Sequence, residues 1–564
     1  MRKFLVLIVI VMTILIYLSS PPGLAVERRD VIVYGGGFAG CAAARNAAAL
    51  MPEKSICLIV PESAEELGGL GTSGGQNFTD IRIWRNQLVT QGSFMRWFTL
   101  SGQFYNTRFM AEIIQKDLAQ YPNLSILYGY DILAVSLKNK KVNDLYLADL
   151  ADWENGSVKW GTRRKILEAK IFIDASDDGR LAMFSGAPVS NGREDWPGQY
   201  LPEEEKAGGW YRQQAATLMF KVTGVQAPSQ PGMLGEWVFT RDALGSWGLA
   251  GGKETWRKNP QVIAFNEKYR SVGPGFAIKP INAAQDGAGS SEWWVNTLLV
   301  FNVDGRVHDR DKGTVNEPRS TAAGYRSLEQ GRREAQELLQ NPEFIETLRQ
   351  FTVNADGQEY GFGQARLILD EKGKPVVGKE LYIRETVHAR QEAQLPSADS
   401  ENTNYAVTAR EAQKAGSDKN SGEDQENYAE RIGLGYYMMD INAYSPEDLK
   451  KSGTYDWPVT RWVRPDWAVS GGEPQNPVYL PYSMLTVQEP DNLLLAGYAV
   501  GCSSFAWAEL RVLPNLAVLG DAAGVAAARA VLYGESPRGF KTEQIRWVQE
   551  KLLEQGARLD KLAS

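Results

Sequence analysis

The chain has few of the residues that build metal centres and disulfide frameworks. It holds two histidines, His308 and His388, and three cysteines in 564 residues. Two histidines are too few for a His-rich metal cluster, and three cysteines without C-x-x-C spacing do not make a disulfide framework. We therefore expect no metal site, and we expect Cys41 and Cys57 to be buried, unreactive thiols.

The chain also lacks an excess of positive charge. It has 61 Lys and Arg against 68 Asp and Glu, a formal net charge of −7. Because phosphate binding needs a basic face, this balance argues against nucleic acid as a partner. A hydrophobic content of 43% and a charged content of 23% are typical of a soluble globular enzyme. The length allows two or more domains.

The apolar run at the start is too short to be a typical membrane span. Phe4–Leu18 would form a helix of about 22 Å, short of the ~30 Å hydrocarbon core. Arg2 and Lys3 precede it and Gly23–Ala25 is a small-x-small cleavage site, so residues 1–25 read as a signal peptide. A retained membrane anchor is the alternative. In both cases we expect the rest of the chain outside the cytoplasm, periplasmic or extracellular.

The clearest motif lies next. Asp30–Tyr34 is a predicted buried strand, an Ala-rich helix is predicted over Cys41–Leu50, and the six residues between them form a G-x-G-x-x-G turn. In such a turn the first Gly allows the tight bend, the second lets a pyrophosphate approach the backbone, and the third lets helix and strand pack closely. The predicted dinucleotide ligands are Gly35, Gly37, Phe38, Ala39 and Gly40.

A second strand, predicted over Ser55–Val60, leads to further cofactor candidates. Dinucleotide folds usually place an acid at the end of this strand to hold the ribose hydroxyls; here Pro61 occupies that position, so Glu62 is the predicted ribose ligand. The alternative is a surface glutamate in an acidic stretch. The glycine-rich loop Leu67–Gly75 follows, and its exposed backbone N–H groups and hydroxyls suit a cofactor bed. The candidates there are Gly68, Gly69, Thr72, Ser73 and Gly74, and Asp174, after the predicted strand Lys165–Ile173, is another.

The end of the chain again shows the pattern of a strand followed by a helix. Asn492–Gly497 is a predicted buried strand, and Ala517–Gly520 reads as a strand-like run that ends in Gly-Asp before an Ala-rich helix. Such a carboxylate would hold a second set of cofactor hydroxyls. The candidates are Leu513, Gly520, Asp521 and Ala522. Two nucleotide-type elements at opposite ends of the chain favour FAD, a long cofactor, over NAD. The alternative reading of Gly520-Asp521 is an ordinary helix cap.

The middle of the chain has a different sequence pattern from the two ends. Residues 186–479 hold short alternating runs such as Thr217–Val222 and Trp294–Asn302, which predict an antiparallel sheet. The polar stretch 397–430 is a predicted exposed loop. We therefore expect an α/β fold: a Rossmann-like FAD-binding domain assembled from residues 26–185 and 480–545, an inserted α+β substrate domain over residues 186–479, and a closing helix over residues 546–564.

These motifs resemble the FAD-dependent oxidoreductases of the glutathione-reductase-like superfamily, and more narrowly a bacterial family sometimes labelled xanthan-lyase-like. The resemblance rests on the stretches Asp30–Ala44, Leu67–Gly75, Asp174–Ala182, Thr217–Val225, Tyr382–Thr386 and Leu480–Gly524. It implies an FAD enzyme and says nothing of the substrate. Three positions depart from the family pattern: Asn442 and Ser504 stand where a histidine is common, and Asp177 replaces a glycine.

A flavin supplies the redox chemistry, so the protein must orient a substrate and accept a proton if a hydroxyl or amine is oxidised. The candidate catalytic residues are His388, Glu385, Arg384, Asp440 and Arg511. The first two and Asp440 are possible bases, whereas the arginines would clamp a carboxylate or stabilise negative charge on the reduced flavin. The alternatives are a structural Arg384–Glu385 ion pair and a hydrogen-bonded, non-catalytic His388. Cys502 is expected to be a small buried thiol rather than a covalent flavin link.

The sequence thus predicts an exported FAD-dependent oxidoreductase that oxidises a small organic or sugar-derived substrate by hydride transfer to the flavin. Oxygen, a quinone or another carrier is the expected electron acceptor, because NAD(P)H is scarce outside the cytoplasm. A membrane is expected as a partner only through the N-terminal anchor. Two alternatives stay open: a nicotinamide-dependent Rossmann enzyme, and a flavin-binding protein without turnover.

Overall fold

The computed structural model of the protein describes residues 24–151, 158–318, 324–390, 406–407, 425–469, 474 and 476–561. Residues 1–23 of the predicted signal peptide or anchor (residues 1–25) and most of the predicted loop 397–430 lie outside these residues. The two predictions therefore stay predictions.

Five parallel strands form the centre of one half of the molecule. They lie in the order β5 (Leu124–Tyr128), β2 (Ile56–Val60), β1 (Val26–Tyr34), β8 (Lys159–Asp174) and β24 (Leu493–Leu495). β2 and β24 are wholly buried runs of mainly Ile, Val and Leu, as expected for parallel strands covered on both faces. The first part of β8 turns into an antiparallel meander with β7 (Lys141–Ala151) and β6 (Tyr130–Lys138).

Helices surround this sheet and the second one. The helices of the described residues are α2 (Phe38–Leu50), α3 (Ser93–Ser101), α4 (Thr107–Leu118), α5 (Arg180–Phe184), α6 (Glu203–Gly208), α7 (Lys253–Lys258), α8 (Pro260–Tyr269), α9 (Leu328–Leu339), α10 (Pro342–Leu348), α12 (Gln425–Tyr428), α13 (Thr460–Val463), α14 (Pro465–Val469), α15 (Ser504–Leu510), α16 (Leu513–Tyr533) and α17 (Thr542–Glu554).

The beginning and the end of the chain meet where α16 packs against α2. A Cβ atom on Gly520 would lie 2.1 Å from the backbone oxygen of Ala39, and one on Gly524 would lie 2.3 Å from that of Ala43. Only glycine allows this approach, and the alanines of α2 keep the facing surface small. Among the described residues α16 alone is long and apolar enough to cross a membrane, yet here it is buried inside the protein.

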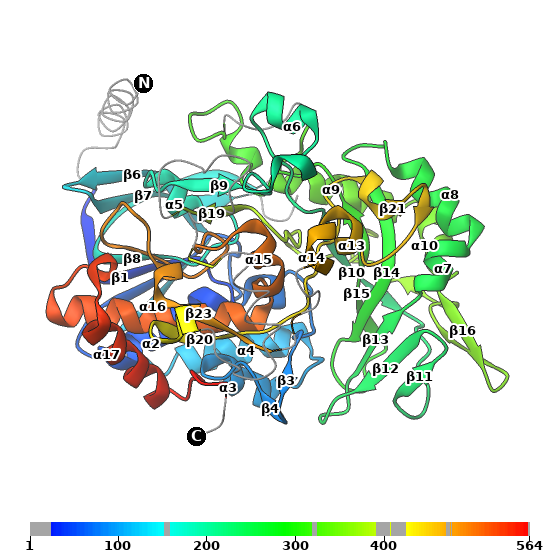
Figure 1. The fold of residues 1–564 in the computed structure, drawn as a ribbon, viewed down its shortest axis with the longest axis horizontal. Helices are drawn as coiled ribbons and strands as arrows, with labels where there is room; N and C mark the ends of the chain where they lie inside the picture. Colours follow the sequence, from blue (N-terminus) through cyan, green and yellow to red (C-terminus); the bar gives the residue numbers. More distant parts are fainter. Residues whose placement is uncertain are drawn as a thin grey trace.

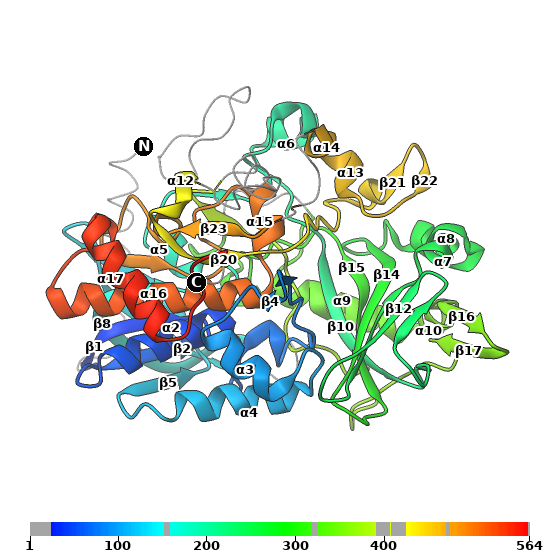
Figure 2. The same ribbon diagram turned by 60° about the horizontal axis from the view of Figure 1, so that its bottom comes forward.

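The second half of the molecule holds a seven-stranded sheet whose strands pair antiparallel. Its order is β11 (Gly232–Leu234), β12 (Trp237–Arg241), β13 (Trp247–Gly251), β14 (Phe276–Gln285), β15 (Glu292–Val300), β10 (Ala216–Thr223) and β18 (Arg366–Leu367). The pairing of β14 with β15 shifts register between Ile278 and Asn282. Figures 1 and 2 show this sheet, in green, beside the parallel sheet.

Short two-stranded sheets complete the fold. They pair β3 (Ile83–Trp84) with β4 (Gln87–Leu88), β9 (Val189–Asn191) with β19 (Val387–Ala389), β16 (Thr352–Ala355) with β17 (Gln358–Gly361), β20 (Arg431–Gly435) with β23 (Val478–Pro481), and β21 (Lys450–Lys451) with β22 (Thr454–Tyr455).

Buried ion pairs tie the loop after β15 to the parallel sheet. Arg180 pairs with Asp311 at 2.6 Å, and His308 Nε2 lies 3.0 Å from Asp178 while its Nδ1 lies 3.0 Å from Glu329. Burial by itself would lower the pKa of His308, but the two carboxylates outweigh it and raise the pKa to about 9. The imidazole is therefore positively charged at neutral pH.

The α/β fold with an inserted antiparallel sheet is confirmed. The predicted strand Asp30–Tyr34 appears as the second half of β1, and the predicted strand Ser55–Val60 appears as β2. The prediction that Gly520-Asp521 opens a helix after a strand is wrong, because α16 begins at Leu513 with Pro514 in its first turn. An apolar run without polar alternation fits a buried helix as well as a buried strand.

Candidate functional site

Three glycines shape the turn between β1 and α2, each for its own reason. Gly35 has a φ of +108°, and a Cβ there would lie 2.7 Å from Ala175. At Gly40 a Cβ would lie 1.7 Å from the oxygen of Gly35, so the helix could not pack so closely. At Gly37 an added Cβ would meet no atom within 4 Å. Gly37 thus presents an open backbone at the start of α2, where helix N–H groups can bind phosphate.

The second glycine-rich loop lies directly on this turn. Gly68 N–H donates to the oxygen of Gly36 at 2.8 Å, and Gly37 and Gly68 form a parallel bridge. Gly69 lines the same cleft as Gly37. The hydroxyl of Thr72 instead donates to Leu67 within the loop at 2.6 Å. The structure therefore brings the two predicted glycine clusters together, with Thr72 shaping the loop.

The two neighbouring residues of the loop differ in their contacts. Gly74 N–H donates to Gly69 at 3.1 Å, within the loop. The hydroxyl of Ser73 donates to Glu380 at 2.8 Å, which is a residue that lines the cleft. Gly74 therefore helps to close the turn, whereas Ser73 orients a carboxyl group of the cleft.

Five acids line the cleft beside Gly37, namely Glu62, Asp177, Asp178, Glu329 and Glu380, and burial leaves three of them with a raised pKa. Glu62, which sequence reasoning predicted, accepts a hydrogen bond from Gly36 N–H. Burial and the nearby Glu380 raise the pKa of Glu62 well above its ordinary value, and burial raises that of Glu380 to about 7. Burial, then Glu380, also raises the pKa of Asp177 well above its ordinary value. Neutral carboxyl groups at these positions lessen repulsion of an anionic ligand.

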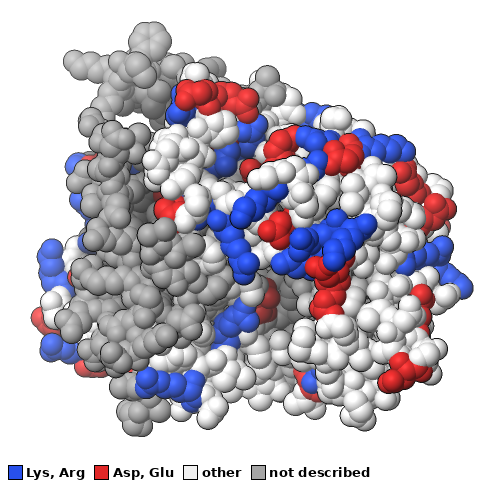
Figure 3. All heavy atoms as spheres, turned by 45° about the vertical axis from the view of Figure 1, so that its right-hand side comes forward, with Lys and Arg blue, Asp and Glu red and all other residues white. Residues whose placement is uncertain are grey.

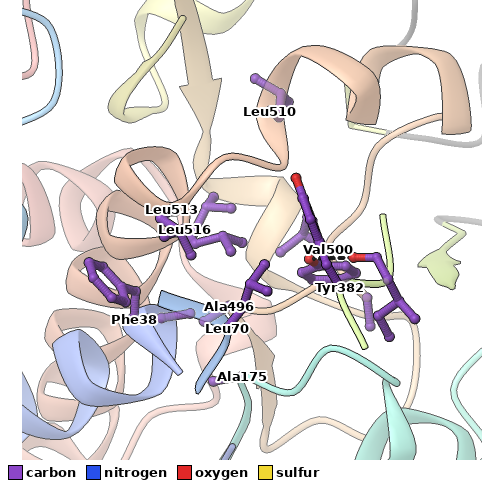
Figure 4. Close-up of a cluster of buried hydrophobic side chains, with 14 of the residues drawn as sticks. Phe38, Leu70, Ala175, Tyr382, Ala496, Val500, Leu510, Leu513 and Leu516 are labelled. Carbon is purple, nitrogen blue, oxygen red and sulfur yellow. Dashed lines mark hydrogen bonds between the residues drawn. The ribbon is translucent and has the colours of Figure 1, made fainter. Parts of the chain in front are cut away.

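A small apolar pocket continues from the glycine turn. Phe38 and Ala39 at the start of α2 line it together with Leu513 and Leu516 from the first turn of α16. Figure 4 shows Phe38, Leu513 and Leu516 grouped near Leu70, with Tyr382 beyond them. Three predicted residues, Phe38, Ala39 and Leu513, therefore meet at one place although they come from opposite ends of the chain.

Two other predicted cofactor carboxylates are engaged inside the protein. Asp174 accepts hydrogen bonds from Ser176 N–H and from Ala182 N–H at 3.0 and 2.7 Å. Asp521, in the middle of α16, accepts from Ser93 N–H at 2.9 Å and from the amide of Asn46 at 2.6 Å. These contacts hold the loop after β8 and the start of α3.

The other two residues predicted around Asp521 have packing positions. Gly520 lies against α2, and Ala522 is fully buried in α16. Neither Gly520, Asp521 nor Ala522 lines either cavity beside Gly37.

Three predicted catalytic residues come together between the two sheets. Arg511 pairs with Asp440 at 2.7 Å and donates to the hydroxyl of Tyr382. The guanidinium of Arg384 lies 4.4 Å from the centre of the Tyr382 ring and donates to Thr217 Oγ1 at 2.9 Å. Both arginines are almost fully buried, and the Nε atoms of both have no hydrogen-bond partner.

Glu385 and His388 belong to a separate buried cluster. The hydroxyl of Ser504 donates to Glu385, and His388 Nε2 lies 3.5 Å from the same carboxylate. His388 Nδ1 lies 4.0 Å from the sulfur of Cys502. Asp195 accepts from Ser504 N–H at 3.0 Å, and burial raises its pKa to about 7. The alternative interpretation, a structural Arg384–Glu385 ion pair, is not seen among the described residues, where Arg384 donates to Ala215 and Thr217 and Glu385 accepts from Ser504.

Sequence reasoning missed two charged residues at the Arg511 cluster. Asp80, five residues after the glycine-rich loop, accepts a hydrogen bond from Tyr437 at 3.2 Å. Burial raises its pKa to about 6, against the lowering effect of nearby arginines. Lys279 lies on β14 and is 3% exposed. No local motif marks either residue, because only the register of the sheets and loops brings them to Arg511.

The described residues fit the FAD that the sequence predicts. The open backbone of Gly37, the N-terminus of α2 and the acid Glu62 match the phosphate and ribose positions of a dinucleotide. The apolar pocket at the first turn of α16 shares Gly37 with that cradle and is also lined by Tyr498. A cofactor bed built from both chain ends suits a long, two-ended cofactor.

The comparisons with known proteins give one family. The model of the FAD dependent oxidoreductase family matches residues 30–552. No curated protein sequence matches the chain. Among solved structures, a geranylgeranyl bacteriochlorophyll reductase-like protein from Thermoplasma acidophilum is 11% identical with a TM-score of 0.33, over 94% of this chain and 85% of that one. The p-nitrophenol 4-monooxygenase of Pseudomonas putida is 10% identical with a TM-score of 0.28, over 64% and 68%.

Proposed function

This chain belongs to the FAD-dependent oxidoreductase family, and from that premise we propose that it is an exported enzyme that oxidises a small organic or sugar-derived molecule by hydride transfer to the flavin. Membership decides between FAD and NAD(P) in favour of FAD. When bound, FAD supplies the hydride acceptor. The protein's part is to hold the cofactor, orient the donor and take up a proton.

Cofactor binding is assigned to the cradle at the start of α2. Gly37 and the free N–H groups of α2 would hold the pyrophosphate, and Glu62 would accept from the ribose hydroxyls. The first turn of α16, with Leu513 and Leu516, would exclude water beside the cofactor. These assignments are supported by the free space beside the backbone of Gly37 and by the residues that line the two cavities.

One observation carries the proposed oxidation. A buried polar cluster lies next to the cofactor cavity: Tyr498 lines that cavity, and its hydroxyl donates to the oxygen of Ile383, one residue before Arg384. The Nε atoms of Arg384 and Arg511 and the amide oxygen of Gln76 are buried, and the described residues offer them no hydrogen-bond partner. Buried polar groups are normally paired. Unused donors and acceptors at this junction therefore support a polar substrate there.

Asp80 is the proton acceptor that we propose. Its carboxylate faces Tyr437 and Gln76, at 3.2 and 3.4 Å, and a pKa of about 6 leaves it ionised yet basic at neutral pH. Removal of a hydroxyl proton by Asp80, together with loss of hydride from the adjacent carbon, would turn an alcohol into a carbonyl. His388, which the sequence suggested as base, is fully buried in the separate Ser504 cluster.

The test uses the protein lacking residues 1–25. Its absorption spectrum is recorded before and after anaerobic addition of sugars, uronic acids, amines and hydroxy acids. We expect flavin bands that one donor class bleaches, and a rate of bleaching about 10²- to 10⁴-fold lower in Asp80→Asn with unchanged flavin content. His388→Gln is the matched comparison. A loss confined to His388→Gln would transfer the role of base to His388, and flavin bands that no donor bleaches would favour a flavin-binding protein without turnover.

Export is supported by the sequence of residues 1–25 alone. Fractionation of cells that express the full chain should place the protein outside the cytoplasm, either free after cleavage near Ala25 or in the membrane fraction if the segment is retained. Recovery in the cytoplasm would contradict this part of the proposal.

A further inference from the structure

Two buried cations at the junction of the sheets, Lys279 and Arg384, have no carboxylate partner among the residues that the structure describes. Lys279 Nζ donates only to the backbone oxygens of Asn296 and Pro280, at 3.0 and 3.3 Å. Arg384 donates only to Ala215 and Thr217, both through oxygen atoms that carry no charge. Neither forms an ion pair with any of the described residues. A buried charge without a counter-ion is costly, so a charge of opposite sign is expected to join it.

The fold aims Lys279 at this place through an irregularity of its strand. Lys279 lies in the segment of β14 where the pairing with β15 shifts register between Ile278 and Asn282. The hydroxyl of Thr297 on β15 donates to the backbone oxygen of Lys279 at 2.5 Å and fixes the shifted segment. Such bulges re-aim side chains and occur often beside active sites.

The charged residues around Lys279 also include fewer free acids than cations. Arg384 and Arg511 act on it as like charges, whereas Asp440 and Asp80 are the acids that act on it. Asp440 is already paired with Arg511, and Asp80 is hydrogen-bonded to Tyr437. Among the described residues, Lys279 and the four charged groups that act on it comprise three cations and two acids with a single ion pair, so one further anion would balance their charge.

The same cluster offers unused hydrogen-bonding groups of both kinds. Asn296 Oδ1 and Gln76 Oε1 are buried acceptors, and the Nε atoms of Arg384 and Arg511 are buried donors, and none of these four atoms has a hydrogen-bond partner within the described part of the chain. A carboxylate uses the donors, and hydroxyl groups donate to the two amide oxygens.

We propose that Lys279 is a carboxylate-binding residue and that the substrate is a hydroxy acid, a small molecule that carries both a carboxylate and hydroxyl groups. This inference rests on the proposed oxidation and names its substrate class. The face of the molecule in Figure 3 carries Lys and Arg interspersed with Asp and Glu, and we assign the selection of an anion to the buried cations rather than to this face.

The binding test does not depend on turnover. Perturbation of the flavin spectrum of the holoenzyme is titrated with two matched pairs, L-lactate with 1,2-propanediol and D-gluconate with D-sorbitol, which differ by the carboxylate. We expect an acid to bind at least about 10-fold more tightly than its neutral partner, and Lys279→Met to weaken its binding about 10- to 100-fold, the range of a hydrogen bond to a charged group. Binding of the neutral partner should not change in the variant.

Lys221→Met is the matched control on the same sheet. Lys221 lies on β10 and is paired with Asp286 and Glu292, both at 2.7 Å. Its replacement should lower the melting temperature and leave carboxylate binding as it is. Lys279→Met should keep or raise the melting temperature, since it removes an unpaired buried charge. If Lys279→Met lowers the melting temperature as much as Lys221→Met does and leaves ligand binding unchanged, Lys279 has a structural role and the inference is overturned.

The pH dependence of binding provides an independent readout. Burial, followed by the like charge of Arg384, lowers the pKa of Lys279 to about 7, so its charge is lost as pH rises. Arg384 and Arg511 stay charged over this range, and Asp80, with a pKa of about 6, is already ionised at pH 7. Carboxylate binding should therefore weaken above pH 7 in the wild type and stay flat in Lys279→Met. The bound carboxylate shifts the midpoint upwards.

Two failures are distinguishable. If donors bleach the flavin but neutral polyols bind as tightly as their acids, or if no carboxylate of the panel binds, the hydroxy-acid inference is overturned while the proposed oxidation stands. If carboxylates bind through Lys279 but no donor ever bleaches the flavin, the proposed oxidation fails and the anion site stands.

Discussion

The replacement of Gly37 by alanine separates the fold from the cofactor site. Gly37 has φ −68° and ψ −174°, which alanine adopts without strain, and a Cβ there meets no atom within 4 Å. Alanine reduces the entropy of the unfolded chain, worth about 0.4–1 kcal/mol of stability, but it is a poorer helix N-cap than glycine by a similar amount. We therefore expect the free energy of unfolding of the apoprotein to change by less than about 1 kcal/mol.

The same methyl group stands where the phosphates must approach the backbone. It would separate the pyrophosphate from the first N–H groups of α2. One or two hydrogen bonds to a charged group are worth about 1.5–3 kcal/mol each, so the loss of about 3 kcal/mol corresponds to roughly 100-fold weaker binding. The assay is titration of apoprotein with FAD, followed by quenching of the flavin fluorescence, alongside urea unfolding without FAD.

Gly40→Ala is the matched variant, three residues further along. A Cβ there would lie 1.7 Å from the oxygen of Gly35 and 2.9 Å from its carbonyl carbon, so α2 must move and the apoprotein should lose at least about 3 kcal/mol. The reasoning is refuted if Gly37→Ala binds FAD as tightly as the wild type, or if it destabilises the apoprotein as much as Gly40→Ala does.

Three further expectations follow from buried acids and one histidine. Asp521→Ala should lower the free energy of unfolding by about 3 kcal/mol, because it leaves the N–H and hydroxyl of Ser93 buried without an acceptor; FAD affinity should not change, and a selective loss of affinity would instead restore the cofactor role predicted for Asp521. The pKa of His308 is raised to about 9, so its contribution of roughly 3 kcal/mol is complete below pH 6.5 and is lost as pH rises through 9; urea unfolding over pH 7–10 should show this loss in the wild type, and an equal loss in His308→Gln would contradict it. Glu380 has a pKa of about 7, so it gains negative charge beside the phosphate cradle between pH 6 and 8; FAD binding should weaken over that range and stay constant in Glu380→Gln, and parallel curves would exclude the effect.

The parts of the site that depend on local sequence could be predicted. The G-x-G-x-x-G turn needs a positive φ, an open backbone and a close approach of helix and turn. In the structure Gly35, Gly37 and Gly40 supply these in that order. The alternation of short runs predicted the antiparallel sheet. Leu513 lines the cofactor pocket and Arg511 belongs to the polar cluster. Because the two residues are only two positions apart in the sequence, their proximity could be predicted from the sequence.

The parts that depend on packing could not be predicted. Ala517–Gly520 is apolar on every side, so nothing in it separates a buried helix from a buried strand, and Asp521 was read as a cofactor ligand where the structure pairs it with Ser93. The sequence around Lys279 and around Asp80 contains no motif that marks either residue as functional. Their meeting with Arg511 is set by strand register and by loop paths that no short motif encodes.

The way in which the two chain ends share one layer has a consequence for biosynthesis. β24 adds to the sheet beside β8, more than 300 residues after it, and α16 covers α2 from the far end of the chain. The ribosome releases β1, β2 and α2 long before these partners exist. The nascent chain therefore presents an incomplete nucleotide cradle with one uncovered face until its last tenth has emerged. Cofactor loading must then follow synthesis, and a chain exported unfolded would acquire its flavin only after translocation.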